Sequence, residues 1–292
     1  MDEVDSFLQS FAESTRNSYA TGIKLFEQFY GKPITEFIKQ LYEDLQKPPL
    51  ERTRIGENVM RNYEKWLERK YAPASVPYYM HVVQSFARYE SIPLPLRYIK
   101  MPKPIPTNPK FKWDLDTVAA FISLLREPIK SVAVVMLQSG LAVGDVLNLR
   151  VEDLYDMGNV PMALEVTRKK TGVHFYTFVG KWGVKHIINS IQATRGPVFP
   201  IGSYVVQYEF KMKARALMKY KGTNPMRPHS LRAAFRSFLF EGGVDPLYAE
   251  FFMGHRIPEE RATYINIPLE GWRKIYAEKC EPLLTPKKWE SI

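Results

Sequence analysis

The chain has 292 residues, of which 45% are hydrophobic, and a formal net charge of +10 at pH 7. This length permits two domains, and the basic excess favours a polyanionic partner, nucleic acid before an acidic membrane surface, although an ordinary basic protein would share it. A single cysteine, Cys280, excludes an intramolecular disulfide framework and a cysteine-rich metal site. The acidic N-terminus is unlike a signal peptide, and no stretch reaches the roughly 20 apolar residues that span a membrane. We therefore expect an intracellular protein.

The first hundred residues are typical of a helical bundle. Four aromatic or aliphatic residues recur at helical spacing: Tyr19, Ile23, Phe26 and Tyr30. Ser14 or Thr15 could cap the start of their helix, and Gly31 is expected to end it. Two similar patterns follow. We predict an N-terminal domain of four or five helices over residues 1–101.

Prolines interrupt the chain after this domain, at positions 102, 104, 106 and 109. Proline removes backbone donors and disfavours helix in the residue before it, so we predict a semi-rigid basic linker over residues 102–112. Basic residues of the linker and of the preceding helices are candidates to contact DNA phosphates, although solvated surfaces explain each of them equally well. These candidates are Arg16, Lys24, Arg88, Lys103 and Lys110.

Residues 113–292 are expected to form a larger, mainly helical domain with a small β-sheet. WDLDTVAAFISLLRE predicts a helix with acids in its first turn. In MALEVTRKKTGVHFYTFV, β-rich residues flank a Lys-Lys-Thr-Gly turn, which predicts a hairpin. The segments after it are typical of helices. A tail over residues 268–292 carries Trp272, Ile275 and Tyr276 at helical spacing.

Some polar residues of this domain suggest phosphate chemistry. His229 and Arg232 are three residues apart, so on a helix they share a face. A guanidinium can grip phosphate in a fork, and an imidazole can donate to an oxygen or carry a proton. His255 follows Gly254 at the end of a predicted helix. Taken singly, each of these residues is more often structural.

A tyrosine and a pair of lysines are further candidates. Tyr264 lies nine residues after His255. A tyrosine hydroxyl is a poor nucleophile at neutral pH unless cations flank it and the electrophile is polarised. Lys169 or Lys170, at the hairpin turn, could protonate a leaving oxygen if its pKa were lowered. Packing and a solvated turn explain these residues when each is considered alone.

The stretch SGLAVGDVLNLR, residues 139–150, predicts that one helix ends at Gly140 and another begins near Asp145. A helix start can hold an anion. However, the position at the turn, where a cation would complete such a site, is Ala142.

The order of these motifs resembles the tyrosine recombinase, or phage integrase, family over residues 113–292, and the N-terminal bundle is similar to that family's core-binding domain. The resemblance implies a helical core-binding domain followed by a tyrosine-recombinase-type catalytic domain. It also implies a site-specific DNA recombinase that cleaves double-stranded DNA through a 3′-phosphotyrosyl link, with no metal or nucleotide cofactor. Such enzymes act as tetramers on DNA, and a monomeric free state is compatible with this. The expected location is the cytoplasm or nucleoid of a prokaryotic host.

The same resemblance assigns roles by motif. Tyr264 is the nucleophile, and Arg232 binds a nonbridging phosphate oxygen. His229 is the candidate acceptor of the tyrosine proton, and His255 is a second donor to the phosphate. Lys170 is the candidate acid, with adjacent Lys169 as the alternative. Asp145 matches an acidic position that supports the site without touching the phosphate.

The family has an arginine where this chain has Ala142, while the residues on both sides match. We interpret this single departure as a deliberate substitution, with a natural variant as the alternative. Arg150, eight residues away at the end of the next predicted helix, is not expected to replace it. We therefore expect severely reduced cleavage by a chain that still binds DNA.

Two other functions stay open. A type IB topoisomerase uses the same groups without choosing a sequence, and the integrase-like N-terminal domain argues against it. A non-catalytic DNA-binding regulator is suggested by Ala142, and the persistence of the other catalytic residues argues against it.

The tail could pack on its own domain or on a neighbouring protomer.

Overall fold

The computed structural model describes residues 2–96, 99–102, 114–154, 156–168, 172–217, 226–257 and 267–291. The chain divides into two compact units, Met1–Asn108 and Pro109–Ile292. The expected linker, from residue 103 onward, lies outside the described residues, and so do Lys103 and Lys110. Within the described ranges no helix is both long and apolar enough to cross a membrane.

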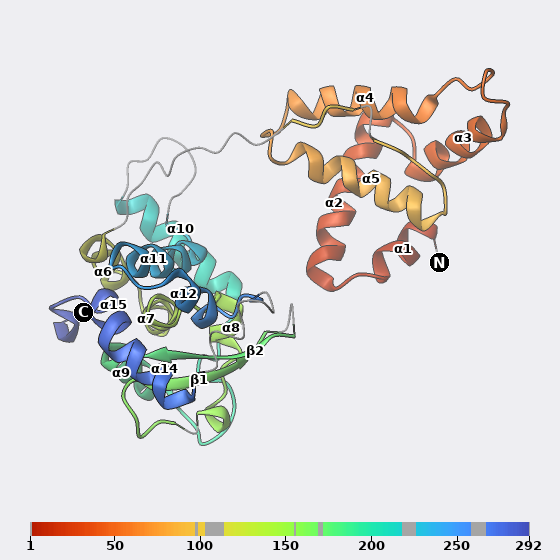
Figure 1. The fold of residues 1–292 in the computed structure, drawn as a ribbon. Coiled ribbons are helices and arrows are strands. Elements are labelled where there is room, and N and C mark those ends of the chain that lie inside the picture. The colour runs from red at the N-terminus through yellow and green to blue at the C-terminus, as the bar shows by residue number, and fades with distance from the viewer. Residues whose placement is uncertain are drawn as a thin grey trace. The chain divides into compact units, whose positions relative to one another are not determined.

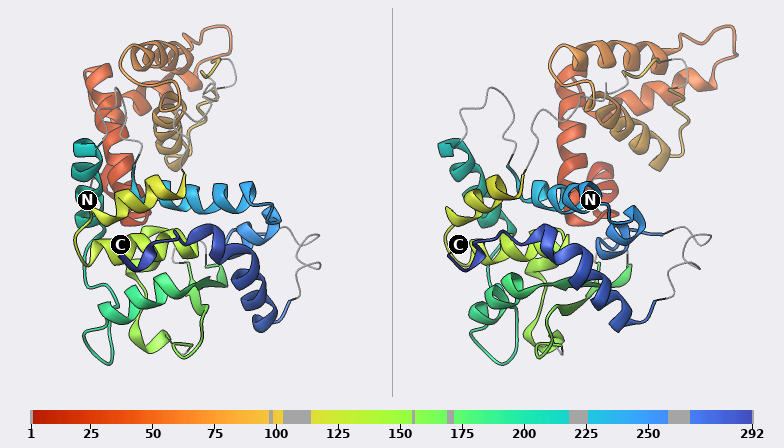
Figure 2. Two further views of the ribbon diagram at one scale, coloured as in Figure 1. Left: turned by 90° about the vertical axis from the view of Figure 1, so that its left-hand side faces the viewer. Right: turned by 60° about the vertical axis from the view of Figure 1, so that its left-hand side comes forward.

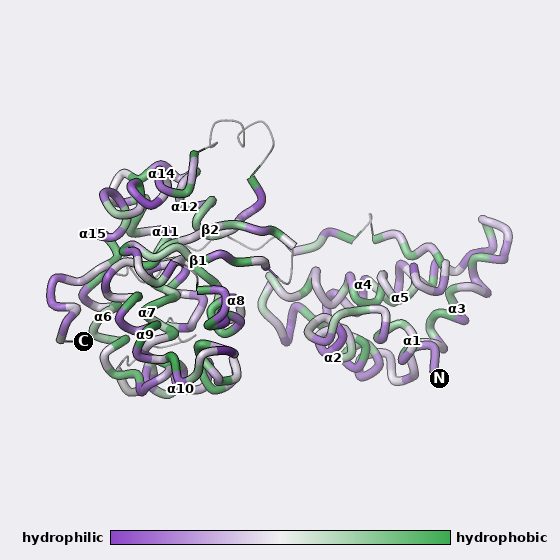
Figure 3. Tube along the Cα trace, turned by 90° about the horizontal axis from the view of Figure 1, so that it is seen from below, coloured by the Kyte–Doolittle hydropathy of each residue, from purple (hydrophilic) through white to green (hydrophobic). Residues whose placement is uncertain are grey.

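The first unit is helical (Figure 1), in keeping with the expected bundle. Its described helices are α1 (Glu3–Gln9), α2 (Glu13–Tyr30), α3 (Ile34–Gln46), α4 (Ile55–Glu68) and α5 (Val76–Tyr89). Hydrophobic and hydrophilic residues alternate along them (Figure 3), as expected for amphipathic helices. The buried rings of Phe26 and Tyr63 meet edge to face, with centroids 5.2 Å apart, where α2 packs on α4.

The ends of α2 test the sequence prediction. Gly31 caps its C-terminus in the left-handed conformation, with φ 76°, as expected. The predicted N-cap was wrong: α2 begins at Glu13, its N-cap is Ala12, and residues 14 and 15 lie inside the first turn. Ala12 has the extended backbone of a cap but offers no side-chain acceptor.

The second unit packs helices around a two-stranded sheet (Figure 1). Its described helices are α6 (Leu115–Ser123), α7 (Ile129–Ser139), α8 (Val143–Leu147), α9 (Lys181–Ser190), α10 (Ser203–Leu217), α11 (Pro228–Glu241), α12 (Pro246–Phe252), α14 (Leu269–Ile275) and α15 (Glu281–Leu284). Short 3-10 turns occupy Val151–Asp153 and Trp289–Ser291, and a π-helical turn, Tyr276–Cys280, joins α14 to α15. The unit is therefore mainly α with a small sheet, as expected.

The hairpin confirms the strand prediction. Strands β1 (Met162–Thr167) and β2 (His174–Val179) pair antiparallel, with Met162 opposite Val179 and Thr167 opposite His174. The predicted first helix of this unit is also present as α6. Asp114 caps it, accepting a hydrogen bond from the Thr117 amide at 2.7 Å.

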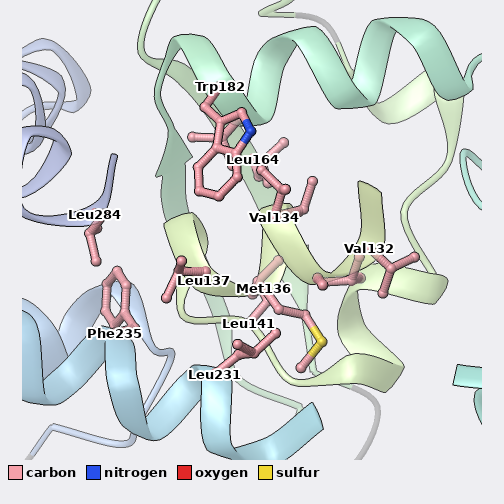
Figure 4. Packing of buried hydrophobic residues seen from close by; sticks show 14 of the residues in the cluster. Val132, Val134, Met136, Leu137, Leu141, Leu164, Trp182, Leu231, Phe235 and Leu284 are labelled. Carbon is pink, nitrogen blue, oxygen red and sulfur yellow. The ribbon is translucent and has the colours of Figure 1, made fainter. Parts of the chain in front are cut away.

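Helix α7 lies at the centre of this unit, and every residue in it except Lys130 is buried. Figure 4 shows Val134 and Leu137 of α7 close to Trp182 of α9 and Phe235 of α11. Deletion of such side chains typically costs about 2–5 kcal/mol. This core fixes the C-terminal end of α7, which is where the candidate site begins.

The tail packs on its own unit. Trp272, Tyr276 and Leu284 are buried in the same core, and α15 packs against α7 and α11 (Figure 2). Gln138 of α7 joins this region, because its side-chain amide donates to the Thr285 hydroxyl at 2.7 Å and its backbone carbonyl accepts from the Tyr276 hydroxyl at 2.7 Å. The described part of the tail therefore packs within its own unit, and docking on a neighbouring protomer stays a prediction.

Candidate active site

Two helix ends form the framework of the site. Gly140 ends α7 with φ 69°, and Gly254 follows α12 with φ 62°. The turn at Gly254 is a Schellman motif, because the His255 amide donates to the Glu250 carbonyl and the Gly254 amide to the Phe251 carbonyl. A Cβ on Gly254 would lie 2.4 Å from the ring of Phe175. Glycine is therefore required at this turn by both conformation and packing.

Arg232 of α11 joins these two helix ends. It is 3% exposed, and its guanidinium donates to the carbonyl of Gly140 and, at 2.8 Å, to the carbonyl of Met253. Carbonyls at helix C-termini carry partial negative charge, which favours a cation there. Burial, and then the positive charge of Arg168, lower the pKa of Arg232 to about 10, so the group stays protonated at neutral pH.

His255 lies between Arg232 and a carboxylate. Its Nε2 is 2.8 Å from the Arg232 guanidinium, and its Nδ1 contacts the carboxylate of Glu250. Because arginine only donates, Nε2 accepts a hydrogen bond from it here. Nδ1 therefore carries the ring proton and donates a hydrogen bond to the Glu250 carboxylate. Glu250 also lies 2.7 Å from a guanidinium nitrogen of Arg236, an ion pair without hydrogen-bond geometry.

Ala142 is the N-cap of α8 and offers no side-chain cap. Three residues on, Asp145 is 15% exposed and pairs with Arg168, whose Nε lies 3.3 Å from Oδ2. Arg168 directly follows β1, and its second contact is to the Gly254 carbonyl at 3.4 Å. The carboxylate of Asp145 is thus held by an arginine that directly follows strand β1.

The structure brings together part of the predicted site. Arg232 and His255 are in contact, and Asp145 joins them through Arg168 and the Gly254 turn. His229 is exposed in the first turn of α11, three residues before Arg232. Other predicted site residues lie outside the described residues, and their roles stay predictions: Tyr264, Lys169 and Lys170.

The remaining predicted residues lie elsewhere. Arg16, Lys24 and Arg88 are exposed in the first unit, and their contact with DNA stays a prediction. Arg150 is not at a helix end as expected, because α8 ends at Leu147. It pairs with Glu152, its Nε donating at 2.7 Å.

Sequence reasoning missed Glu250 and Arg168. Glu250 lies five residues before His255, a spacing that a Schellman turn brings together, so Gly254 was the available signal. Arg168 directly precedes the predicted Lys-Lys-Thr-Gly turn, and no local signal in the sequence marks it as different from the neighbouring lysines. Its contact with Asp145 spans 23 residues and depends on how the hairpin packs.

Tyr276 is unsuited to act as a nucleophile. Its hydroxyl donates to a backbone carbonyl, its side chain is fully buried, and burial raises its pKa well above the ordinary value. The described residues also include no group of three or more His, Cys, Asp or Glu side chains placed to hold a metal ion.

The fold is that of the tyrosine recombinases. It is similar to a λ integrase dimer bound to a COC′ core site, at 15% identity and a TM-score of 0.61, over 90% of this chain and 93% of that one. It is also similar to the Tn1549 transposon integrase in complex with a circular intermediate DNA, at 14% identity and 0.53, over 88% and 98%. A λ integrase tetramer bound to a Holliday junction is similar as well, at 16% identity and a TM-score of 0.57, over 90% of this chain and 76% of that one.

A comparison of the sequence with family profiles identifies the family of this chain. The profile of the phage integrase family matches residues 115–268, more than half of the chain, so this protein belongs to that family. A search of curated proteins found no match. Members of the family are tyrosine recombinases, which are DNA strand transferases.

Proposed function

We propose that this chain is a site-specific, integrase-like recombinase that cleaves and rejoins double-stranded DNA through a 3′-phosphotyrosyl intermediate. The observation that carries the proposal is the placement of Arg232, a buried cation fixed by two helix ends with His255 against it. A preorganised cation of this kind stabilises the negative charge that develops on a phosphate during transfer.

The proposed chemistry is a balanced exchange of phosphate esters. The Tyr264 oxygen attacks the phosphorus, a tyrosyl–phosphate bond forms, and the bond to the 5′-oxygen breaks. His229 takes the tyrosine proton, and Lys170, or adjacent Lys169, gives a proton to the 5′-oxygen. Arg232 and His255 bind nonbridging oxygens. Rejoining reverses these steps with a 5′-hydroxyl from another strand, so no cofactor is consumed.

The proposed site has Ala142 where the family has arginine, and this limits the rate. Loss of one oxyanion donor typically slows a reaction by about 10²–10³. Binding is less affected, because one lost phosphate contact lowers the slope of log affinity against log salt by only about one. We propose that the chain assembles as a tetramer on two DNA sites, a proposal supported by the similar fold of a λ integrase tetramer bound to a Holliday junction.

The test begins with duplexes selected from a randomised pool by binding to the chain. Nicked versions of these duplexes trap covalent adducts on denaturing gels. We expect Ala142→Arg to raise the rate of adduct formation by about 10²–10³-fold. We expect Tyr264→Phe to abolish adducts in either background. Binding without any adduct from Ala142→Arg would support the non-catalytic regulator instead. Relaxation of a plasmid that lacks the selected site would favour a topoisomerase.

A further inference from the structure

Arg168 and Arg232 both contact one short turn, residues 253–255. Arg232 donates to the Met253 carbonyl and contacts His255, and Arg168 donates to the Gly254 carbonyl between them. The two guanidinium groups therefore converge on three consecutive residues, although Arg168 comes from the hairpin and Arg232 from α11. This turn is the part of the site that holds His255.

The charges around the turn favour an anion. Arg168, Arg232 and Arg236 contribute three guanidinium groups, while Asp145 and Glu250 contribute two carboxylates. Arg168 is close enough to Arg232 for its charge to lower the pKa of that group. Like charges held together in a partly buried place are costly, and a bound anion relieves the repulsion.

Arg168 has donors to offer. A guanidinium carries five N–H groups, and among the described residues the contacts of Arg168 to Asp145 and Gly254 use two of them. Both contacts are long, at 3.3 and 3.4 Å. The side chain is 16% exposed, so it is more accessible than that of Arg232. Fork-shaped guanidinium donors match the oxygens of a phosphate diester.

From this geometry we infer that Arg168 is a second phosphate-binding cation of the site, which Asp145 orients and which sustains the cleavage that remains when position 142 carries no charge. The inference rests on the proposed recombinase function.

The experiment compares Arg168→Gln in the chain with Ala142 and in the Ala142→Arg background, on the binding-selected nicked duplexes. We expect a loss of about 10²-fold in adduct formation with Ala142, the typical cost of one oxyanion donor. In the Ala142→Arg background the introduced guanidinium supplies a charge, so we expect Arg168→Gln to reduce adduct formation by less than about ten-fold. The reason is that the effects of substitutions at neighbouring sites with a shared role are not additive. A purely structural role predicts the same loss in both backgrounds, which would overturn the inference.

Two further variants separate charge from folding. Arg168→Lys keeps the charge and the ion pair, so we expect it to retain more activity than Arg168→Gln. Asp145→Asn breaks the ion pair but leaves the Arg168 charge in place. We therefore expect Asp145→Asn to reduce adduct formation less than Arg168→Gln does. Equal losses for Asp145→Asn and Arg168→Gln would mean that Arg168 only holds the hairpin. Thermal unfolding midpoints of all variants identify any that fail to fold.

Salt dependence of DNA binding gives a readout that does not require cleavage. A guanidinium that contacts a phosphate contributes about 0.9 to the slope of log affinity against log salt. We expect Arg168→Gln to lower the slope by about this amount, and an unchanged slope would count against the inference. If Ala142→Arg with Arg168 intact gives no adduct that depends on Tyr264, the recombinase proposal itself fails. Adducts without any effect of Arg168 would overturn only the present inference.

Discussion

The guanidinium of Arg232 and the imidazole of His255 face each other at 2.8 Å, and Glu250 holds the opposite side of the ring. The contact joins α11 to the turn after α12. It fixes which nitrogen of His255 carries a proton when no phosphate is bound, because arginine can only donate. The position of the ring therefore depends on a carboxylate that lies one helical turn before it.

Glu250→Gln should reduce adduct formation while leaving DNA binding nearly unchanged. A hydrogen bond to a charged group contributes about 1.5–3 kcal/mol, which corresponds to roughly 10–10²-fold in rate if it is lost from the transition state. The measurement is adduct yield with the Ala142→Arg chain, where the signal is larger. Glu278→Gln, in an exposed pair with Lys274, is the matched control and should have no effect. Equal activity of both variants would mean that His255 needs no orienting carboxylate.

Gly254→Ala should destabilise the second unit and displace His255. The φ of 62° costs a residue with a Cβ about 1–2 kcal/mol, and the clash with Phe175 adds about 1–3 kcal/mol. Gly243→Ala is the control, because its φ is 75° and nothing lies within 4 Å of an added Cβ. Unfolding in denaturant should show a larger loss for Gly254→Ala. Equal losses would show that Phe175 yields to the methyl group.

Local patterns predicted the elements of this chain better than the contacts between them. The hairpin, the α6 cap and the glycines that end α2 and α7 follow from residue types at fixed spacing, so they were readable from the sequence. The pairing of Arg168 with Asp145 was not, because it depends on how a hairpin packs beside α8. The placement of Tyr276 against Gln138 spans 138 residues, and helical spacing alone allowed packing within the chain or on a neighbour.

Tyr276→Phe should lower the free energy of unfolding by about 1–3 kcal/mol. The substitution leaves the carbonyl of Gln138, at the end of α7, buried without the hydroxyl that donates to it. Denaturant unfolding of the full chain measures the loss. Tyr204→Phe is the control, because Tyr204 is 76% exposed on α10, and it should leave stability unchanged. If the two variants are equally stable, the hydrogen bond to Gln138 contributes nothing net.

Acid should destabilise the start of α4, because protonation of Asp44 weakens the hydrogen bonds that it accepts there. Burial raises the pKa of this carboxyl, but hydrogen bonds from the amide and hydroxyl of Thr53 and the amide of Ile55 outweigh it and hold the pKa at about 2. Because the folded pKa is below the ordinary value, the stabilisation is present above about pH 4 and is lost as pH falls towards 2. Hydrogen exchange of residues 50–58, corrected for intrinsic rates, should show protection at pH 5 that declines by pH 2.5. Asp44→Asn should remove this pH dependence, whereas Glu43→Gln, at an exposed neighbour, should keep it. A decline of the same size in Asp44→Asn would assign the acid sensitivity to another group.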